Sequence, residues 1–212
     1  MELIELFNIF RHYFCHLNEK TTTMKKTFLA VLAILTSVLT YAQVTISDVT
    51  LPKKVQFNEK TLILNGGGLR EKFWIDLYVG GLYLPSKMNS AQRIIQANQP
   101  QAIKLVIVSS LISSEKMEEA VEEGFEKSTN GNTKPLRAKI DKFKSFFSTE
   151  PIKKDDIFDI VYIPGKGTIV YKNNKIIGTV EGLEFKRALF GIWLGDEPAD
   201  EDLKEGMLGL ED

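Results

Sequence analysis

The sequence predicts an α+β protein in which helices pack on one face of a large antiparallel sheet. Segments rich in β-branched and aromatic residues come first and return after residue 151, as expected for strands. Between them lies a pair of amphipathic helical segments, and another helical stretch closes the chain. Runs of strands followed by runs of helices, instead of a strict alternation, are typical of α+β folds.

The first half of the domain is expected to be mainly extended. Residues 44–57 carry two extended pieces, and residues 61–64 pair with residues 73–84. The three glycines at 66–68 are expected to permit a turn with positive φ and a close approach of backbones. The glycine pair at 80–81 indicates a bulge, or a place where another element packs against bare backbone.

Periodicity and capping signals define the later elements. In the first long helix, Met117, Ala120, Val121 and Phe125 form one apolar face. Asn173-Asn174 predicts a two-residue hairpin, since asparagine tolerates positive φ. The expected elements are a helix at 91–97, a central strand at 103–109, a helix capped by Ser113 or Ser114 and ending at Asn130-Gly131, a helix from Pro135, strands at 156–163, 168–172 and 175–180, a helix at 182–190, a glycine-flanked turn with Trp193, and a last helix at 200–208.

Residues 1–42 are not expected to belong to the folded domain. A basic start at Met24, an apolar core at 27–39 and a small-x-small exit at 40–42 predict a signal peptide at 24–42, cleaved after Ala42. Residues 1–23 are then an upstream extension or a mis-assigned start, and residues 43–212 are the domain, periplasmic or secreted. The alternative is a genuine N-terminal extension with an uncleaved apolar segment.

Composition excludes several classes of site from the mature domain. The only cysteine, Cys15, and both histidines, His12 and His16, precede the expected cleavage point. The domain therefore has no Ser-His-Asp triad, no cysteine nucleophile, no disulfide and none of the usual zinc or copper ligands. We expect no metal and no cofactor. The formal net charge of the whole chain, −1, gives no electrostatic basis for nucleic-acid binding.

Arg70 is the candidate functional residue that stands out, because it follows directly on the three glycines. A phosphate-binding loop is excluded there, since the third glycine of the dinucleotide motif is missing and a strand, not a helix, follows. A glycine turn before Arg70 is expected to present its charge at the mouth of the sheet. The alternative is a structural ion pair between Arg70 and a buried carboxylate.

Two motifs resemble the bacterial chalcone isomerase-like proteins. One is Asn65-Gly66-Gly67-Gly68-Leu69-Arg70 with Leu77-Tyr78-Val79-Gly80-Gly81-Leu82-Tyr83-Leu84, and the other is Ala188-Leu189-Phe190-Gly191-Ile192-Trp193-Leu194-Gly195-Asp196. The resemblance extends over about residues 44–208. It implies an open-faced β-sandwich, a long antiparallel sheet with helices on one side and a ligand cleft between them.

The resemblance also implies roles for single residues. In plant chalcone isomerases the arginine after the glycines steadies an oxyanion, and Arg70 matches it. Tyr78 stands where a threonine assists through a water. Ser113 and Ala120 stand near the places of an active-site tyrosine and asparagine, so this chain departs from the catalytic pattern there. In plastid relatives the same arginine and a tyrosine hold a fatty-acid carboxylate.

We therefore expect a non-catalytic binding protein for a small amphipathic carboxylate such as a fatty acid. The expected ligand-binding residues are Arg70, Tyr78, Tyr83, Trp74 and Ser113. Phe73, Trp74 and the apolar helix faces are expected to supply the walls of the cleft. The protein is expected to be a monomer, without a nucleic-acid partner or stable membrane insertion. Two alternatives remain. One is an isomerase or lyase that uses Arg70 as electrophile with Tyr78, and the other is an envelope protein whose cleft is filled by its own side chains.

Overall fold

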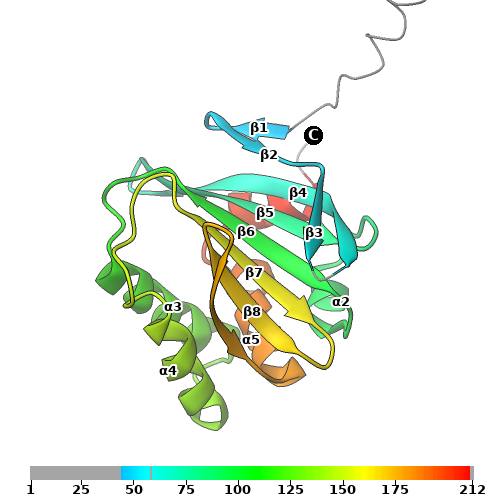
Figure 1. Cartoon of the computed structure of the whole chain (residues 1–212), viewed down its shortest axis with the longest axis vertical. Helices are drawn as coiled ribbons and strands as arrows, with labels where there is room; N and C mark the ends of the chain where they lie inside the picture. Colours follow the sequence, from blue (N-terminus) through cyan, green and yellow to red (C-terminus); the bar gives the residue numbers. More distant parts are fainter. Residues whose placement is uncertain (1–43, 58, 211–212) are drawn as a thin grey trace, which may run out of the picture. The chain divides into compact units, whose positions relative to one another are not determined.

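Seven strands form one antiparallel sheet in the computed structural model, which describes residues 44–57 and 59–210. Each strand pairs with the next along the chain, so the sheet is a meander (Figure 1). Its strands are β3 (Lys54–Phe57), β4 (Lys60–Lys72), β5 (Ile75–Leu84), β6 (Gln101–Ile107), β7 (Ile157–Ile163), β8 (Gly167–Lys172) and β9 (Lys175–Val180). A separate hairpin of β1 (Val44–Ile46) and β2 (Val49–Leu51) precedes it. The expected signal peptide at 24–42 and residues 1–23 lie outside the described residues.

The helices gather on one side of this sheet, which confirms the expected α+β architecture (Figure 1). They are α2 (Ala91–Gln96), α3 (Ser114–Ser128), the short 3-10 turn η1 (Lys134–Leu136), α4 (Arg137–Ser145), α5 (Leu183–Leu194) and α6 (Glu201–Leu208). Ser113 caps α3 by accepting a hydrogen bond from the backbone N–H of Lys116, as predicted. Asn173-Asn174 also makes the predicted two-residue hairpin, with φ of 50° and 67°.

Two expectations about local structure were wrong. The glycines at 66–68 do not turn: they lie inside the long strand β4, and none of them has positive φ. The turn comes later, at Phe73-Trp74. The helix expected to stop at residue 190 continues to Leu194, so Trp193 is helical and buried, not part of a turn.

The sheet buries apolar side chains on both faces. On the helix side one large core includes the aromatic cluster of Phe125, Phe143 and Phe185. The other face has a smaller core around Leu51 and Tyr83. The edge strand β3 lies close to β8, the strand next to the opposite edge, because the rings of Phe57 on β3 and Tyr171 on β8 are 5.6 Å apart. In a flat sheet these strands would be about 24 Å apart, so the sheet is curled.

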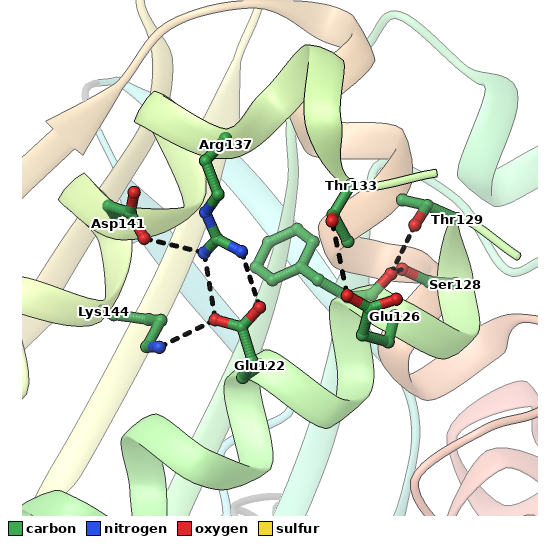
Figure 2. Close-up of polar contacts among 9 residues, drawn as sticks. Glu122, Glu126, Ser128, Thr129, Thr133, Arg137, Asp141 and Lys144 are labelled. Atoms are coloured by element: carbon green, nitrogen blue, oxygen red, sulfur yellow. Dashed lines mark hydrogen bonds and ion pairs between the residues drawn. The ribbon is translucent and has the colours of Figure 1, made fainter. Parts of the chain in front are cut away.

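Helices α3 and α4 are joined by a charged contact centred on Glu122 (Figure 2). Arg137 donates to both carboxylate oxygens of Glu122, at 2.6 and 2.9 Å, and Lys144 donates at 2.7 Å. These hydrogen bonds, from Arg137 first and Lys144 second, lower the pKa of Glu122 to about 2. The contact holds α3 in place over the sheet, and α3 provides one wall of the pocket described next.

Candidate ligand-binding site

A pocket of about 390 Å³ lies between the β4–β5 hairpin, the segment before α3, and α3 itself. This volume falls in the range of about 300–1,000 Å³ that is common for small-molecule sites. Its walls are mostly apolar, with charged side chains at a few points. The lining residues are Arg70, Lys72, Phe73, Ile75, Leu77, Tyr78, Leu111, Ile112, Lys116, Met117, Glu119, Ala120 and Glu123.

Strand pairing and a β-bulge place the polar residues of this pocket. Arg70 and Tyr78 are direct cross-strand partners, which explains how residues eight positions apart in the chain reach one point. Directly after this pair the register shifts, because Leu77 is an extra residue on β5. A bulge turns two consecutive side chains to one face. Leu77 and Tyr78 therefore both line the pocket, whereas Glu71 and Asp76 do not.

The hydroxyl of Tyr78 is held by two donors. The indole Nε1–H of Trp193, on α5, donates to it at 2.9 Å, and Arg70 Nη1 donates over a longer 3.4 Å. The guanidinium carbon of Arg70 also lies 5.5 Å from the centre of the Tyr78 ring. A phenol oxygen accepts two hydrogen bonds and donates one. With both donors in place, the proton of Tyr78 is directed to a third group, and the hydrogen bonds of the described residues supply no acceptor for it.

Arg70 has buried hydrogen-bonding capacity in the pocket that the described residues do not use. Among the described residues it makes no ion pair, so the expected alternative of a structural pair with a buried carboxylate is wrong. Its Nε–H is buried without a partner. Glu123 lies in the opposite wall, but its hydrogen bond goes to Lys127, which is the main cause of its lowered pKa; the charges of Lys72 and Arg70 add to that shift.

The structure brings only some of the predicted site residues together. Arg70 and Tyr78 meet in the pocket. Ser113 is not a lining residue: its hydroxyl is engaged as the cap of α3, while its neighbour Ile112 lines the wall. Trp74 is 92% exposed at the hairpin tip and is not a lining residue. Tyr83 is fully buried in the core on the other face of the sheet, where burial and the charge of Asp159 raise the pKa of its hydroxyl.

Sequence reasoning missed one polar member of the site and several wall residues. Trp193 was placed in a turn, because glycines flank its segment, and no local signal shows that its indole reaches Tyr78. Leu77 was missed because strict alternation along a strand puts it on the face opposite Tyr78. Met117 and Ala120 belong to the helix face that was expected to help form the apolar walls, and both line the pocket, as Phe73 does.

The described residues contain no cluster of His, Cys, Asp and Glu suited to a metal ion. Within the same residues, no helix has the length and apolar character needed to cross a membrane.

Comparison with known proteins places this geometry in a family. The family model described as chalcone isomerase-like matches residues 43–209. The crystal structure of the Arabidopsis thaliana fatty-acid binding protein AtFAP1 is similar in fold, with a TM-score of 0.63 and 20% sequence identity over 78% of this chain and 95% of that chain. No curated protein matches the sequence. The family match spans most of the chain, and the chain therefore belongs to the chalcone isomerase-like family.

Proposed function

We propose that this protein binds a small amphipathic carboxylate such as a fatty acid, with the carboxylate at Arg70 and Tyr78 and the alkyl chain along the apolar walls. The observation that carries the proposal is the polar end of the pocket. There an arginine without a carboxylate partner lies beside a tyrosine whose hydroxyl proton is free to be donated.

This arrangement suits a carboxylate better than a neutral polar group. A carboxylate only accepts hydrogen bonds, and both Arg70 and Tyr78 offer donors. The guanidinium adds a charge and a planar geometry that matches two carboxylate oxygens. Trp193 contributes indirectly, because its N–H occupies one acceptor position of Tyr78 and so favours donation by the hydroxyl toward the pocket. Leu77, Ile112 and the other apolar lining residues supply the walls.

The similar protein from Arabidopsis thaliana is named as a fatty-acid binding protein, which supports the same class of ligand for this chain. The positions of Ser113 and Ala120 support binding over catalysis. The hydroxyl of Ser113 is engaged as a helix cap, and Ala120 contributes only a methyl group to the wall. Neither residue provides the tyrosine phenol or the asparagine amide of the plant enzymes.

Titration calorimetry with straight-chain acids of eight to eighteen carbons tests the proposal. Arg70→Ala is expected to weaken binding about ten- to a hundredfold, because a charged hydrogen bond contributes roughly 1.5–3 kcal/mol. Arg70→Lys restores part of the loss, since an ammonium lacks the planar fork. Tyr78→Phe costs about 1 kcal/mol. Trp193→Phe is expected to weaken acid binding by less than Tyr78→Phe does. When Tyr78→Phe is already present, adding Trp193→Phe is expected to cause no further loss of binding, because Trp193 acts through the Tyr78 hydroxyl.

Two controls separate binding from folding. Arg93→Ala changes an exposed arginine on α2 and is expected to bind as the parent does. The alcohols of the same chain lengths are expected to lose most of the affinity that Arg70 provides. If Arg70→Ala binds every acid as tightly as the parent but melts at a much lower temperature, Arg70 has only a structural role. Rapid cyclisation of chalcone that depends on Arg70 would instead support the isomerase alternative.

A further inference from the structure

The tip of the β4–β5 hairpin exposes two large aromatic side chains. Phe73 and Trp74 form the two-residue loop between Lys72 and Ile75, and they are 78% and 92% exposed. Exposed aromatic residues of this size normally contact something, because their burial is favourable by about 1.5–3 kcal/mol each.

The backbone of this tip is strained. Phe73 and Trp74 have φ of 54° and 61°, a region that bulky residues rarely occupy. Two-residue hairpin loops with positive φ favour asparagine and glycine. The same chain follows that rule at the β8–β9 hairpin, where Asn173 and Asn174 have φ of 50° and 67°. Aromatic residues at one tip and asparagines at the other indicate that the Phe73-Trp74 side chains serve a purpose outside the fold.

The exposed tip is continuous with the ligand pocket. Phe73 and Ile75 belong to both the tip and the pocket wall. Leu111, which is 54% exposed, lines the pocket from the segment before α3. Four of the seven large hydrophobic side chains that are exposed in the described part of the chain therefore lie at this one place: Phe73, Trp74, Ile75 and Leu111.

Two basic side chains lie next to the tip on the pocket side, and two acidic side chains, Glu119 and Glu123, line the same pocket further along α3. The pocket side carries Lys72 and Lys116, and neither makes an ion pair within residues 44–57 and 59–210. The Lys72 ammonium lies 5.9 Å from the ring centre of Phe73, beside the tip. The acidic residues of the hairpin, Glu71 and Asp76, do not line the pocket, and Asp76 accepts a hydrogen bond from Ser47 of the β1–β2 turn. The tip and the part of the rim nearest to it, residues 72–75 with Leu111 and Lys116, are therefore apolar and basic, whereas the acidic lining residues lie further along α3.

We propose that the tip, residues 72–75, docks together with Leu111 and Lys116 on the surface of an anionic lipid bilayer. Aromatic rings bury their apolar part at the acyl boundary, while lysines beside them reach the lipid phosphates. Docking in this way turns the rim of the pocket toward the bilayer. The docked protein could then take up its ligand directly from the bilayer, because an amphipathic carboxylate partitions into membranes; this step rests on the proposed function. The docking itself rests only on the residues of the tip and the adjoining rim.

Tryptophan fluorescence with vesicles tests the docking. The chain has two tryptophans, of which Trp74 is 92% exposed and Trp193 is 5% exposed. Vesicles of phosphatidylcholine with phosphatidylglycerol are expected to shift the emission to the blue and to protect Trp74 from acrylamide. Phosphatidylcholine alone is expected to do so less, because Lys72 and Lys116 then meet no net charge.

Matched variants of the full chain assign the effect to the tip. Trp74→Ser is expected to weaken vesicle binding about ten- to a hundredfold, by loss of one buried aromatic ring. Ile176→Ser removes an apolar side chain that is 63% exposed on β9, away from the tip, and is expected to leave binding unchanged. Since all variants retain residues 1–42, differences between them report the hairpin. Phe73→Asn with Trp74→Gly is expected to abolish docking while raising Tm, because it relieves the backbone strain.

Three results would overturn the docking proposal. One is an unchanged Trp74 emission with anionic vesicles. Another is equal loss of vesicle binding in Trp74→Ser and Ile176→Ser. The third is a concentration-dependent dimer that Trp74→Ser dissolves, which would identify a second copy as the partner of the tip. Calorimetry with octanoic acid, without vesicles, tests the pocket separately, so failure of docking and failure of the proposed function are distinguishable.

Discussion

Lys186 is a charged residue placed wholly inside the protein, at the junction of α5 and α2. Its Nζ donates to the carbonyls of Ile94, Ile95 and Ala97, at 2.7, 3.0 and 3.1 Å, and so caps the C-terminal end of α2. The ring of Phe190 lies 4.7 Å from the ammonium. Burial lowers the pKa of Lys186 to about 7, and the charge of Arg187 contributes.

The lowered pKa predicts how the stability of the protein changes with pH. Between about pH 7 and the usual lysine pKa of about 10.4, the unfolded chain holds a proton on Lys186 that the folded chain has released. The free energy of unfolding should therefore rise with pH across this window, by at most about 1.4 kcal/mol per unit, and the gain is lost as pH falls through 7. Denaturant unfolding from pH 6.5 to 9.5 measures this slope.

Lys186→Met is the control for that prediction. The variant leaves the carbonyls of α2 unpaired and is expected to be less stable at every pH. The diagnostic quantity is therefore the change of the unfolding free energy with pH, and not its value at one pH. The slope due to this residue should disappear. An identical slope in parent and variant would mean that the three carbonyls keep the ammonium protonated throughout the range.

The two tryptophans show what the sequence discloses at the scale of single residues. Trp74 was expected in the site because it lies in an aromatic strand near Arg70, yet it is at the exposed tip. Trp193 was expected in a turn, yet its indole bonds to Tyr78. Arg70 was singled out because a glycine turn was expected to present it at the mouth of the sheet; that turn does not exist, and cross-strand pairing with Tyr78 places Arg70 instead. The partner of a buried donor is a non-local fact, and nothing within a few residues of Trp193 encodes it.

At the scale of elements, glycines let α6 lie against the sheet. Added Cβ atoms at Gly66, Gly68 and Gly80 would meet α6, the first at 2.1 Å from the carbonyl oxygen of Gly206. Asn65, the extra residue of a bulge in β4, fixes the same helix by donating to the carbonyl of Met207 at 2.9 Å. The helix and the strand are thus in backbone contact, which only residues without a side chain permit.

Gly66→Ala is therefore expected to destabilise the protein by at least about 3 kcal/mol, at the upper end of the cost of overpacking, because backbone atoms and not a flexible side chain oppose the new methyl group. Thermal melts and hydrogen exchange in α6 measure the effect. Gly165→Ala is the matched control: no atom lies within 4 Å of its added Cβ, and only the positive φ of 79° is strained, at about 1–2 kcal/mol. Equal costs for the two variants would show that α6 does not pack closely on β4.

The same glycines explain the main error in predicting these elements. The three glycines were expected to permit both a turn and a close approach of backbones; the turn is wrong, and the close approach is confirmed. Conversely the true turn at Phe73-Trp74 contains no turn-forming residue, so local chemistry gave no indication of it. Elements with ordinary caps and periodicity, such as α3 and the β8–β9 hairpin, were predicted close to their observed bounds.

For the whole molecule, the architecture was predictable because it follows from the order of elements. Consecutive strands pair as a meander, even where helices interrupt the connections β5–β6 and β6–β7, and these helices cover the apolar face. The curl of the sheet and the pocket were not predictable in this way, since both depend on contacts between distant segments, such as Phe57 with Tyr171. The family resemblance indicated that a cleft exists, but the sequence does not predict the shift of register at Leu77 that shapes this cleft.

The last prediction concerns the maturation of the chain. We propose export with cleavage after Ala42, which the start of the family match at residue 43 and of β1 at Val44 supports. N-terminal sequencing of the protein from its own host is expected to begin at Gln43. Signal peptidases require a small residue before the cut but not at the position preceding it. Ala42→Leu should therefore accumulate as precursor, whereas Tyr41→Phe should be processed normally.

Retention of residues 1–42 would change the chemistry that is available to the protein. Recovery of intact residues 1–42 in a membrane fraction would disprove cleavage and would retain Cys15, His12 and His16 in the working protein. Thiol and imidazole chemistry would then need to be considered. If cleavage occurs, the mature protein has neither side chain, and any proton transfer in its pocket must use a tyrosine, lysine or carboxylate such as Tyr78 or Glu123. Native mass spectrometry of the processed protein would then show directly which acid, if any, it carries from the cell.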